Sequence, residues 1–377
     1  MTNTISLSPR IRKSPFFEAT LEAGVKAFTV YNNTYLPIGY SDPESEFWKL
    51  VNDVALWDVT CQRVTEIAGP DAFKFMDSLT PRDMTKCRPG QCKYVLLTDQ
   101  FGGIVNDPVL LQLSDDKYWL SAADSDIQMW CKGIAVNAGL DVTVCEPEVA
   151  TLQMQGPKSA PLAEELFGPE AMDIKYYEFI ETELAGSPVL LARTGWSAER
   201  GYEIYVRDTA KGRDVWDTVM KAGQAYGIVP AVPSRIRRIE AGILDYSVDM
   251  DTKTNPFEVG MDRVVTLDTG RPFIGDEALR KIRDEGICRK LVGVEIEGDP
   301  LSYNEHDWPV FADDKRIGQV TSTVYTPRGK RNIGYAMVPL AYTELGTTFR
   351  VETTDGNRQA TVVEKPFTDA NKSLARK

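Results

Sequence analysis

The stretch IAGPDAFKFMDSL, from Ile67 to Leu79, has a counterpart in MQGPKSAPLAEELFG, from Met154 to Gly168. Each begins with a short apolar strand, continues through Gly-Pro and ends in a segment whose apolar residues recur at helical spacing. The similarity indicates a weak internal repeat, although two strand-to-helix signals can also coincide by chance. Two related α+β halves of this kind would form a pseudo-symmetric body with a cleft or channel between them.

A different pattern follows after about residue 285. Apolar and polar residues alternate there, and an Asp355-Gly356 pair supplies a hairpin turn, which together indicate a small all-β domain. The alternating stretches are LVGVEIEG, RIGQVTSTVY, NIGYAMVP and TTFRVETTDGNRQATVVE. We therefore expect an α+β body of two subdomains over residues 1–284 and a β-domain over residues 285–377.

Composition restricts the classes of partner. The chain of 377 residues is 42% hydrophobic, enough for a large core, and its formal net charge of −12 repels nucleic-acid phosphates and anionic membranes. No apolar run approaches the length of a membrane span, and the N-terminus lacks the apolar segment of a signal peptide. We expect a cytoplasmic protein that binds small molecules, with no nucleic acid and no membrane as partner; a homodimer stays open.

Cysteine and histidine usage argues against metal and triad chemistry. The six cysteines have no CxxC spacing, and the single histidine, His306, lies in a polar, turn-like context without a nucleophile elbow. Multi-histidine metal sites and hydrolase triads are difficult to build from this inventory. We expect reduced cysteines and no metal.

The stretch RTGWSAERGYEIYV, from Arg193 to Val206, places a carboxylate in an otherwise apolar strand. Period-two alternation puts Glu203 and Tyr205 on one face of a strand that is entered through a glycine-bounded turn. If that face meets solvent, the pair is ordinary; if it meets a cavity, the pair is a site. Trp196, beside a glycine and polar neighbours, suits a flat heteroaromatic ligand or an onium cation held by cation–π attraction.

Two further segments each allow two interpretations. FGGIVNDPVL, from Phe101, is typical of an Asx-stabilised hairpin, but Asp107 lies inside the strand rather than at its tip, where a carboxylate needs a partner. The segment from Ser234 to Asp249 contains an amphipathic helix. Its arginines are either solvated or, in the first turn, able to meet an anionic ligand tail.

Taken together, these motifs resemble the folate-binding family of the glycine cleavage T-protein, or aminomethyltransferase. The stretches that carry the resemblance occur in the family order: GQCKYVLLTDQFGGIVNDPVL, RTGWSAERGYEIYV, RIEAGILDYSVD, NPFEVGM and FIGDEAL. They span nearly the whole chain, and the late β segments match the family's C-terminal barrel. The resemblance implies an α+β, three-domain fold in which two pseudo-repeated halves bind tetrahydrofolate and a β-barrel domain follows.

The resemblance also implies roles for single residues. Tyr94 matches the tyrosine near the pterin ring, and Glu203 matches the glutamate that binds the pterin's amino-pyrimidine edge, where a carboxylate suits two adjacent N–H donors. Asp107 matches the acid beside N5 of tetrahydrofolate, the atom that accepts the one-carbon unit, and would orient N5 or act as a base. Asn106 replaces the family's first acid. Tyr205 could touch either ligand.

Departures from the aminomethyltransferase pattern make glycine cleavage a weaker interpretation. Trp196 stands where that pattern has tyrosine, and the pattern's folate-site arginine aligns with Ser234, which leaves Arg235 as a substitute at the cofactor. Other stretches resemble the dimethylsulfoniopropionate demethylase branch of the family: RKSPFFEATLEAGVKAFTVYNN, WDVTCQR, GGIVNDPV, WLSAADSD and GWSAERGYEIYV. That branch moves a methyl group from a sulfonium compound to tetrahydrofolate, giving 5-methyltetrahydrofolate and a thioether acid.

Substrate residues follow from the same branch. Trp196, Tyr31 and Phe16 would hold the cation by their aromatic faces, and Lys13 or Ser121 would receive the donor's carboxylate. Direct in-line attack by N5 needs alignment and desolvation rather than a metal or a covalent nucleophile. The sequence leaves open a betaine, methylamine or methoxy-aromatic donor, glycine cleavage, and a non-catalytic folate-binding protein.

Overall fold

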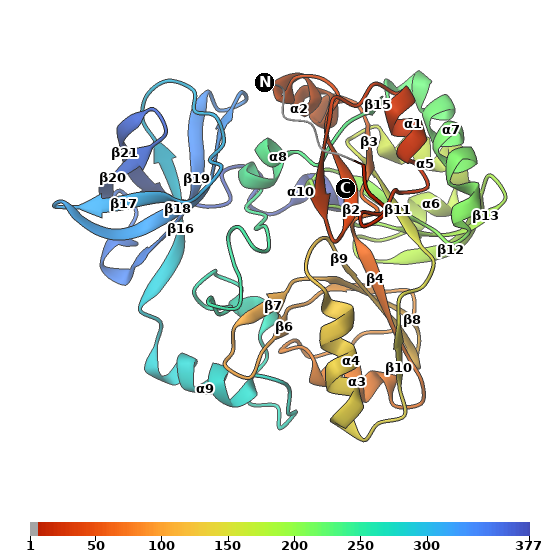
Figure 1. Cartoon of the computed structure of the whole chain (residues 1–377), viewed down its shortest axis with the longest axis horizontal. Helices are drawn as coiled ribbons and strands as arrows, with labels where there is room; N and C mark the ends of the chain where they lie inside the picture. The colour runs from red at the N-terminus through yellow and green to blue at the C-terminus, as the bar shows by residue number, and fades with distance from the viewer. Residues whose placement is uncertain (1–6) are drawn as a thin grey trace.

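A computed structural model describes residues 7–377, which form an α+β body joined to a β-barrel (Figure 1). The first half of the body is an antiparallel sheet in the order β10-β4-β9-β8-β5. Helices α3 and α4 share one apolar core with this sheet. The elements are β4 (Arg63–Ala68), α3 (Ala72–Ser78), β5 (Cys92–Tyr94), β8 (Val109–Ser114), β9 (Lys117–Ala122), α4 (Ile127–Ala138) and β10 (Thr143–Cys145), with a hairpin of β6 (Leu97–Thr98) and β7 (Ile104–Asn106).

The second half is a six-stranded sheet in the order β12-β13-β14-β11-β3-β15, antiparallel except where β15 runs beside β3. Residues of α5 and α7 join its strands in a second core, which also takes in the N-terminal Phe16. The elements are β3 (Ala55–Asp58), β11 (Ala150–Gln155), α5 (Ser159–Phe167), α6 (Glu170–Asp173), β12 (Phe179–Leu184), β13 (Ser187–Ala192), β14 (Gly201–Val206), η1 (Thr209–Lys211), α7 (Gly212–Gly223), η2 (Gln224–Tyr226) and β15 (Val229–Pro230). Before them come α1 (Phe17–Glu22), the hairpin β1 (Ala27–Tyr31) and β2 (Thr34–Gly39), and α2 (Pro43–Asn52).

The two halves repeat one local arrangement. Strand β4 leads through Gly69 into α3, and β11 leads through Gly156 into α5. Both glycines have a positive φ, +136° and +123°, and a Cβ at either position would lie 2.5 Å from the carbonyl oxygen of Asp141 or Asp53. Only glycine fits such a turn without strain. The structure therefore confirms the internal repeat and the α+β fold class.

The two sheets face each other across an apolar layer. Trp119 of β9 and Tyr205 of β14 belong to this layer, and their ring centroids lie 6.2 Å apart. The face of β14 that carries Glu203 and Tyr205 is turned toward the first half, while Tyr202 and Ile204 pack in the helix-covered core. All residues of β14 are buried. The Glu203 and Tyr205 pair thus lies between the two halves and does not meet solvent.

The C-terminal part is a closed barrel in the order β16-β19-β18-β17-β20-β21, as the alternating sequence predicts. Helix α9 precedes the barrel, and Trp308 and Val310 lie in the apolar interior of the barrel. The elements are η3 (Asp262–Val264), α9 (Asp276–Glu285), β16 (Arg289–Ile296), β17 (Trp308–Ala312), β18 (Lys315–Thr326), β19 (Arg331–Pro339), η4 (Leu340–Tyr342), β20 (Thr348–Thr353), β21 (Gly356–Val363) and α10 (Ser373–Arg376).

Helix α8 (Arg235–Glu240) lies between the body and the barrel (Figure 1). It is shorter than the stretch from Ser234 to Asp249 suggests, because Gly242 has a φ of +70° and the chain turns back, with the Ile243 N–H donating to the Arg238 carbonyl at 2.9 Å. The Tyr335 hydroxyl of β19 donates to the Ile239 carbonyl at 2.9 Å. The barrel therefore holds the end of this helix directly.

The chain ends beside the body. In α10, the Ala375 carbonyl accepts a hydrogen bond of 3.0 Å from the Arg193 guanidinium, and Figure 1 shows the C-terminus close to α10 near the middle of the molecule. The six cysteines, all within the described range, are unpaired. From residue 7 onward, no helix combines the length and apolar character that crossing a membrane requires.

Candidate functional site

A buried carboxylate marks the space between the two sheets. Glu203 accepts hydrogen bonds from Gln153 Nε2 at 2.7 Å, from the Tyr205 hydroxyl at 3.3 Å and from the Thr194 hydroxyl. Burial raises the pKa of Glu203, and the hydrogen bonds from Thr194, Gln153 and Tyr205 oppose that shift. The charge is thus partly compensated, and its remaining lone pairs can accept from a ligand that carries adjacent N–H groups.

Gln153 and Thr194 are site residues that the sequence reasoning missed. Gln153 lies directly opposite Glu203 in the pairing of β11 with β14, and its Oε1 accepts from the backbone N–H of Trp196 at 3.3 Å. It therefore links the carboxylate to the turn that carries Trp196. A glutamine in the buried strand ATLQMQ is as unusual as Glu203 in its own strand, and that anomaly is the signal that could have found it.

A second acid, Asp107, follows β7 and is partly buried. The Tyr94 hydroxyl donates to Asp107 Oδ2 at 2.9 Å, which supplies the partner that the sequence requires. Burial raises the pKa of Asp107 to about 7, the hydrogen bond from Tyr94 lowers it, and the nearby carboxylate of Asp245 raises it. An acid with this pKa exchanges its proton near neutral pH, as acid–base chemistry requires.

Asn106 holds Asp107 in place. Its Oδ1 accepts from the Asp107 backbone N–H at 2.9 Å, and its Nδ2 donates to the Asp124 carbonyl at 2.8 Å and to the Ser125 hydroxyl at 2.9 Å. A carboxylate at position 106 could not make the two donations, because an ionised acid only accepts. The amide at this departure from the family pattern therefore ties Asp107 to the loop after β9.

The predicted donor residue Trp196 is partly buried and has a cation beside it. The Arg238 guanidinium lies 5.7 Å from the centre of the Trp196 ring and forms an ion pair with Asp249 at 2.7 Å. Asp249 in turn accepts from the hydroxyls of Thr321 and Ser322, each at 2.6 Å, on barrel strand β18. A chain of polar contacts thus runs from the barrel to Trp196.

The remaining predicted donor residues separate into two groups. Tyr31 is partly buried, and its pKa is raised by burial and by the carboxylate of Asp245. Ser121 is buried, with its hydroxyl beside that of Tyr205. Both adjoin the residues described above.

Phe16 and Lys13 lie elsewhere. Phe16 is fully buried in the core of the second half, 6.3 Å from the Trp216 ring. Lys13 is exposed, pairs with Glu18 at 2.9 Å and lies 4.5 Å from the centre of the Phe17 ring. The structure does not bring these two residues to Asp107 or Glu203, and their roles stay predictions.

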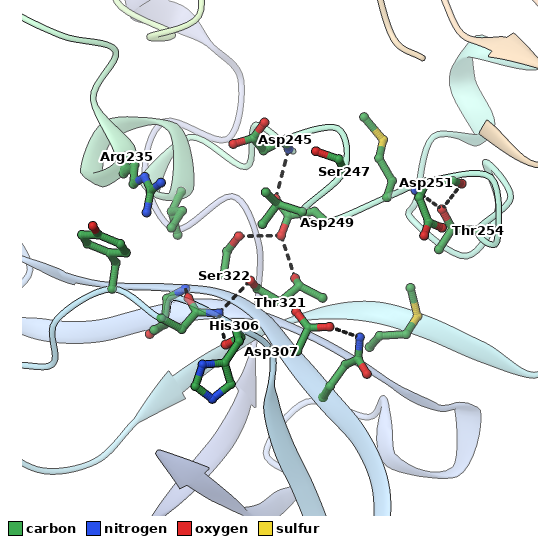
Figure 2. Close-up of a pocket in the computed structure, with 18 of the residues that line it drawn as sticks. Arg235, Asp245, Ser247, Asp249, Asp251, Thr254, His306, Asp307, Thr321 and Ser322 are labelled. Atoms are coloured by element: carbon green, nitrogen blue, oxygen red, sulfur yellow. Dashed lines mark hydrogen bonds between the residues drawn. The ribbon is translucent and has the colours of Figure 1, made fainter. Parts of the chain in front are cut away.

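A cavity of about 810 Å³ separates α8 and the following segment from the barrel (Figure 2). Arg235, the predicted cofactor residue, lines it and is exposed, with its guanidinium 4.2 Å from the centre of the Tyr303 ring. Asp245 also lines it, whereas Glu203 and Asp107 do not. The cavity has the size of a small-molecule site, and Asp245 connects it electrostatically to Asp107 and Tyr31.

The arginines of α8 resolve the two interpretations of that helix. Arg237 and Arg238 are buried in ion pairs, the former with Glu199 at 2.6 Å, so neither is solvated. Arg235 and Arg238 both line the cavity, and of the two only Arg235 is exposed. Over residues 7–377, no group of three or more His, Cys, Asp or Glu side chains is arranged to hold a metal ion.

Comparison with known proteins identifies the family to which this chain is similar. The GCVT N-terminal domain model matches residues 16–269, and the glycine cleavage T-protein C-terminal barrel domain model matches residues 289–369. The chain is 36% identical to the dimethylsulfoniopropionate demethylase DmdA of Ruegeria pomeroyi, over 95% of this chain and 97% of the relative. It is 30% identical to an aminomethyltransferase of Lysinibacillus sphaericus, over 96% and 99%.

The fold agrees with a solved structure of the same family. The glycine cleavage system aminomethyltransferase T of Bartonella henselae superposes with a TM-score of 0.84 at 21% identity, over 95% of this chain and 98% of that one. The two family models and these relatives together cover both the body and the barrel. The protein therefore belongs to the glycine cleavage T-protein family of tetrahydrofolate-dependent transferases.

Proposed function

We propose that this protein moves a methyl group from a sulfonium donor, with dimethylsulfoniopropionate as first candidate, to N5 of tetrahydrofolate. The products would be 5-methyltetrahydrofolate and 3-methylthiopropionate. The observation that carries the proposal is the 36% identity, over nearly the full length of both chains, to a dimethylsulfoniopropionate demethylase. Aminomethyltransferases match at about 30%, so the choice of donor rests on that one relative and on the site.

Glu203 would bind the pterin. Its carboxylate is buried and faces the layer between the two sheets, where the amino-pyrimidine edge of a pterin offers two parallel N–H donors. Gln153 and Thr194 fix the carboxylate and leave acceptor capacity for such a ligand. Arg235 at the cavity is our candidate for the carboxylates of the folate tail.

Asp107 would act at N5. In the reaction, the N5 lone pair forms a bond to the methyl carbon, the sulfur–methyl bond breaks, and sulfur keeps its electron pair as a neutral thioether. N5 then loses its proton, and a carboxylate with a pKa of about 7, oriented by Tyr94, is suited to orient the N5 hydrogen and take that proton. The protein supplies alignment and desolvation for an already activated methyl group.

Trp196 and Tyr31 would contact the onium head of the donor. Both rings are partly buried, and each desolvated contact of a cation with an aromatic face contributes on the order of 1 to 2 kcal/mol. For the donor's carboxylate, the hydroxyl of Ser121 is buried beside Tyr205, on the face of β14 that also carries Glu203, whereas Lys13 is exposed and paired with Glu18. We therefore favour Ser121 over Lys13 for this contact.

The test is a donor panel. Protein is incubated with tetrahydrofolate and dimethylsulfoniopropionate, glycine betaine, methylamines or a methoxy-aromatic acid, and 5-methyltetrahydrofolate is measured by chromatography. Turnover with dimethylsulfoniopropionate in preference to betaine supports the proposal. Turnover with another donor alone would reassign the substrate, and bound folate without transfer from any donor would leave only a folate-binding role.

A further inference from the structure

Asp245 carries a charge that the protein itself compensates only weakly. It lies in the turn after α8, at the edge of the cavity opposite the barrel residues Thr321 and Ser322 (Figure 2). No donor of residues 7–377 is within hydrogen-bonding distance of its carboxylate, and its nearest cation, Arg238 Nη2, is 3.9 Å away. Arg238 is itself engaged by Asp249 at 2.7 Å. A partly buried carboxylate of this kind lacks the partner that burial normally demands.

The surroundings of Asp245 are those of the proposed donor site. The negative charge of Asp245 raises the pKa of the Tyr31 hydroxyl and that of the Asp107 carboxyl group, so Asp245 lies near both. Ser247, two residues on, donates to Asp124 Oδ2 at 3.4 Å, and the Asp124 carbonyl accepts from Asn106, the neighbour of Asp107. These contacts link the turn after α8 to the loop that carries Asp107.

Trp196 alone is a poor cage for a second cation. The Arg238 guanidinium, 5.7 Å from the centre of its ring, already uses the attraction of the π-system, and like charges repel in a site that excludes water. A cationic donor beside Trp196 therefore needs a counter-charge. Asp245 is an acid that lines the cavity and also lies near Tyr31 and Asp107.

We infer that the Asp245 carboxylate is the counter-ion for the positive head of the methyl donor, and that it selects onium donors over molecules of the same shape whose head carries no charge. The inference rests on the proposed function and deepens it. The positive charge on sulfur disappears as the methyl group leaves, so an anion stabilises the bound donor more than the transition state. Asp245 is thus a binding and specificity residue, and its loss raises KM while kcat stays the same or increases.

The experiment compares two ligands of the same shape, one with a positively charged head and one with an uncharged head. 4-Methylpentanoate keeps the carboxylate of dimethylsulfoniopropionate but has an uncharged CH group in place of the sulfonium sulfur, and it serves as a competitive inhibitor. We expect Asp245→Asn to raise KM for dimethylsulfoniopropionate at least tenfold, with kcat not reduced and Ki for 4-methylpentanoate within twofold of wild type. Asp307→Asn is the matched control, because Asp307 lines the same cavity on the barrel side and is hydrogen-bonded to Gln319. Its ratio of KM to Ki should stay within twofold of wild type.

A pH profile separates an electrostatic role from a structural one. The acid limb of kcat/KM should shift to lower pH in Asp245→Asn, because the carboxylate of Asp245 raises the pKa of Asp107. The other charged or titratable groups that act on this pair are Arg235, Arg238, Asp124, Asp249, Tyr31 and Tyr94, and they are unchanged in the variant. Asp245→Glu should restore most of the affinity for the onium donor.

Each outcome decides between the two claims. If wild-type protein transfers methyl groups but Asp245→Asn keeps its KM, or raises KM and Ki in parallel, the inference is wrong and the proposed function stands. If wild-type protein transfers no methyl group from any donor, both are wrong. Should Asp245→Asn fail to fold, as judged by circular dichroism, Asp245→Ser carries the same expectations.

Discussion

At the scale of single residues, the position of Glu203 on its strand could be predicted from the sequence, but not all of the residues that contact it could. The alternation of its strand places it on one face with Tyr205, and the structure puts that face between two sheets. Its partner Thr194 comes from the same stretch, but Gln153 lies on distant β11 and meets Glu203 only through the register of β11 with β14. The register of two strands depends on how both of them pair, so it cannot be predicted from the sequence of one strand.

Replacing Glu203 tests the pterin contact. Glu203→Gln replaces one acceptor oxygen by an NH2 group, which would face the N–H donors of the pterin. Because a charge-assisted pair of hydrogen bonds is lost, we expect folate to bind about 100-fold more weakly. Isothermal calorimetry with tetrahydrofolate measures this change. Glu181→Gln, at an exposed position of β12, is the control. Equal folate affinity in Glu203→Gln and wild type would remove this assignment.

Asp107 should control the pH dependence. Its pKa is raised to about 7, so the carboxyl group is protonated, and unable to accept a proton, at lower pH. We expect kcat/KM of the wild type to increase tenfold per pH unit up to about pH 7 and to level off above it. Asp107→Asn should lower kcat about 100-fold, with folate affinity within a few-fold and a flat profile in this range. An unchanged acid limb in the variant would assign the pKa to another group.

Aromatic residues mark the limit of prediction at this scale. Phe16 and Tyr31 both follow from the resemblance as cage residues, yet Phe16 is fully buried in the helix-covered core while Tyr31 is partly buried near Asp245. A short N-terminal stretch does not say which of its rings is turned inward, because packing against distant α7 decides it.

At the scale of elements, α8 shows what periodicity misses. The apolar spacing predicts a helix, and there is one, but it ends after six residues at a left-handed turn. Two of its three arginines are buried, because acids from the turn before β14 and from the segment after α8 neutralise them. The pattern of charges along one helix cannot show acids that arrive from other parts of the chain.

The buried pair of Arg237 and Glu199 should matter for stability. Its atoms Nε and Oε1 are 2.6 Å apart, and both side chains are almost fully shielded from water. Arg237→Met leaves Glu199 as an uncompensated buried charge, so we expect the free energy of unfolding to fall by about 3 to 5 kcal/mol. Urea titration followed by circular dichroism measures it. Adding Glu199→Gln to Arg237→Met should recover part of the loss, and no recovery would indicate that packing rather than charge is responsible.

At the scale of the whole molecule, the order of motifs predicts more than any one of them. The repeated strand-to-helix stretches and the late alternating strands give the two related halves and the barrel, both of which the structure confirms. The contacts between these parts could not be predicted, because they join residues far apart in sequence, such as Asp249 with Thr321 and Ser322. The cavity beside α8 is formed by such contacts.

The barrel should therefore influence the choice of donor. Thr321 and Ser322 donate to Asp249, which orients Arg238 beside Trp196. We expect the double variant Thr321→Val and Ser322→Ala to raise KM for the donor several-fold while the Kd for tetrahydrofolate stays within twofold. Steady-state kinetics and calorimetry measure the two quantities. A parallel change in both would mean that the barrel supports the whole body rather than the donor site.

The docking of α10 against the turn that carries Trp196 has a consequence for fusions to the C-terminal end of this chain. Arg193 and Arg200, at the two ends of the turn that carries Trp196, donate to the backbone carbonyls of Ala375 and Lys377. A purification tag or fluorescent fusion attached directly after Lys377 would begin beside that turn. Measuring the KM for the donor before and after removal of a cleavable fusion at this position would show whether the docking of α10 affects donor binding.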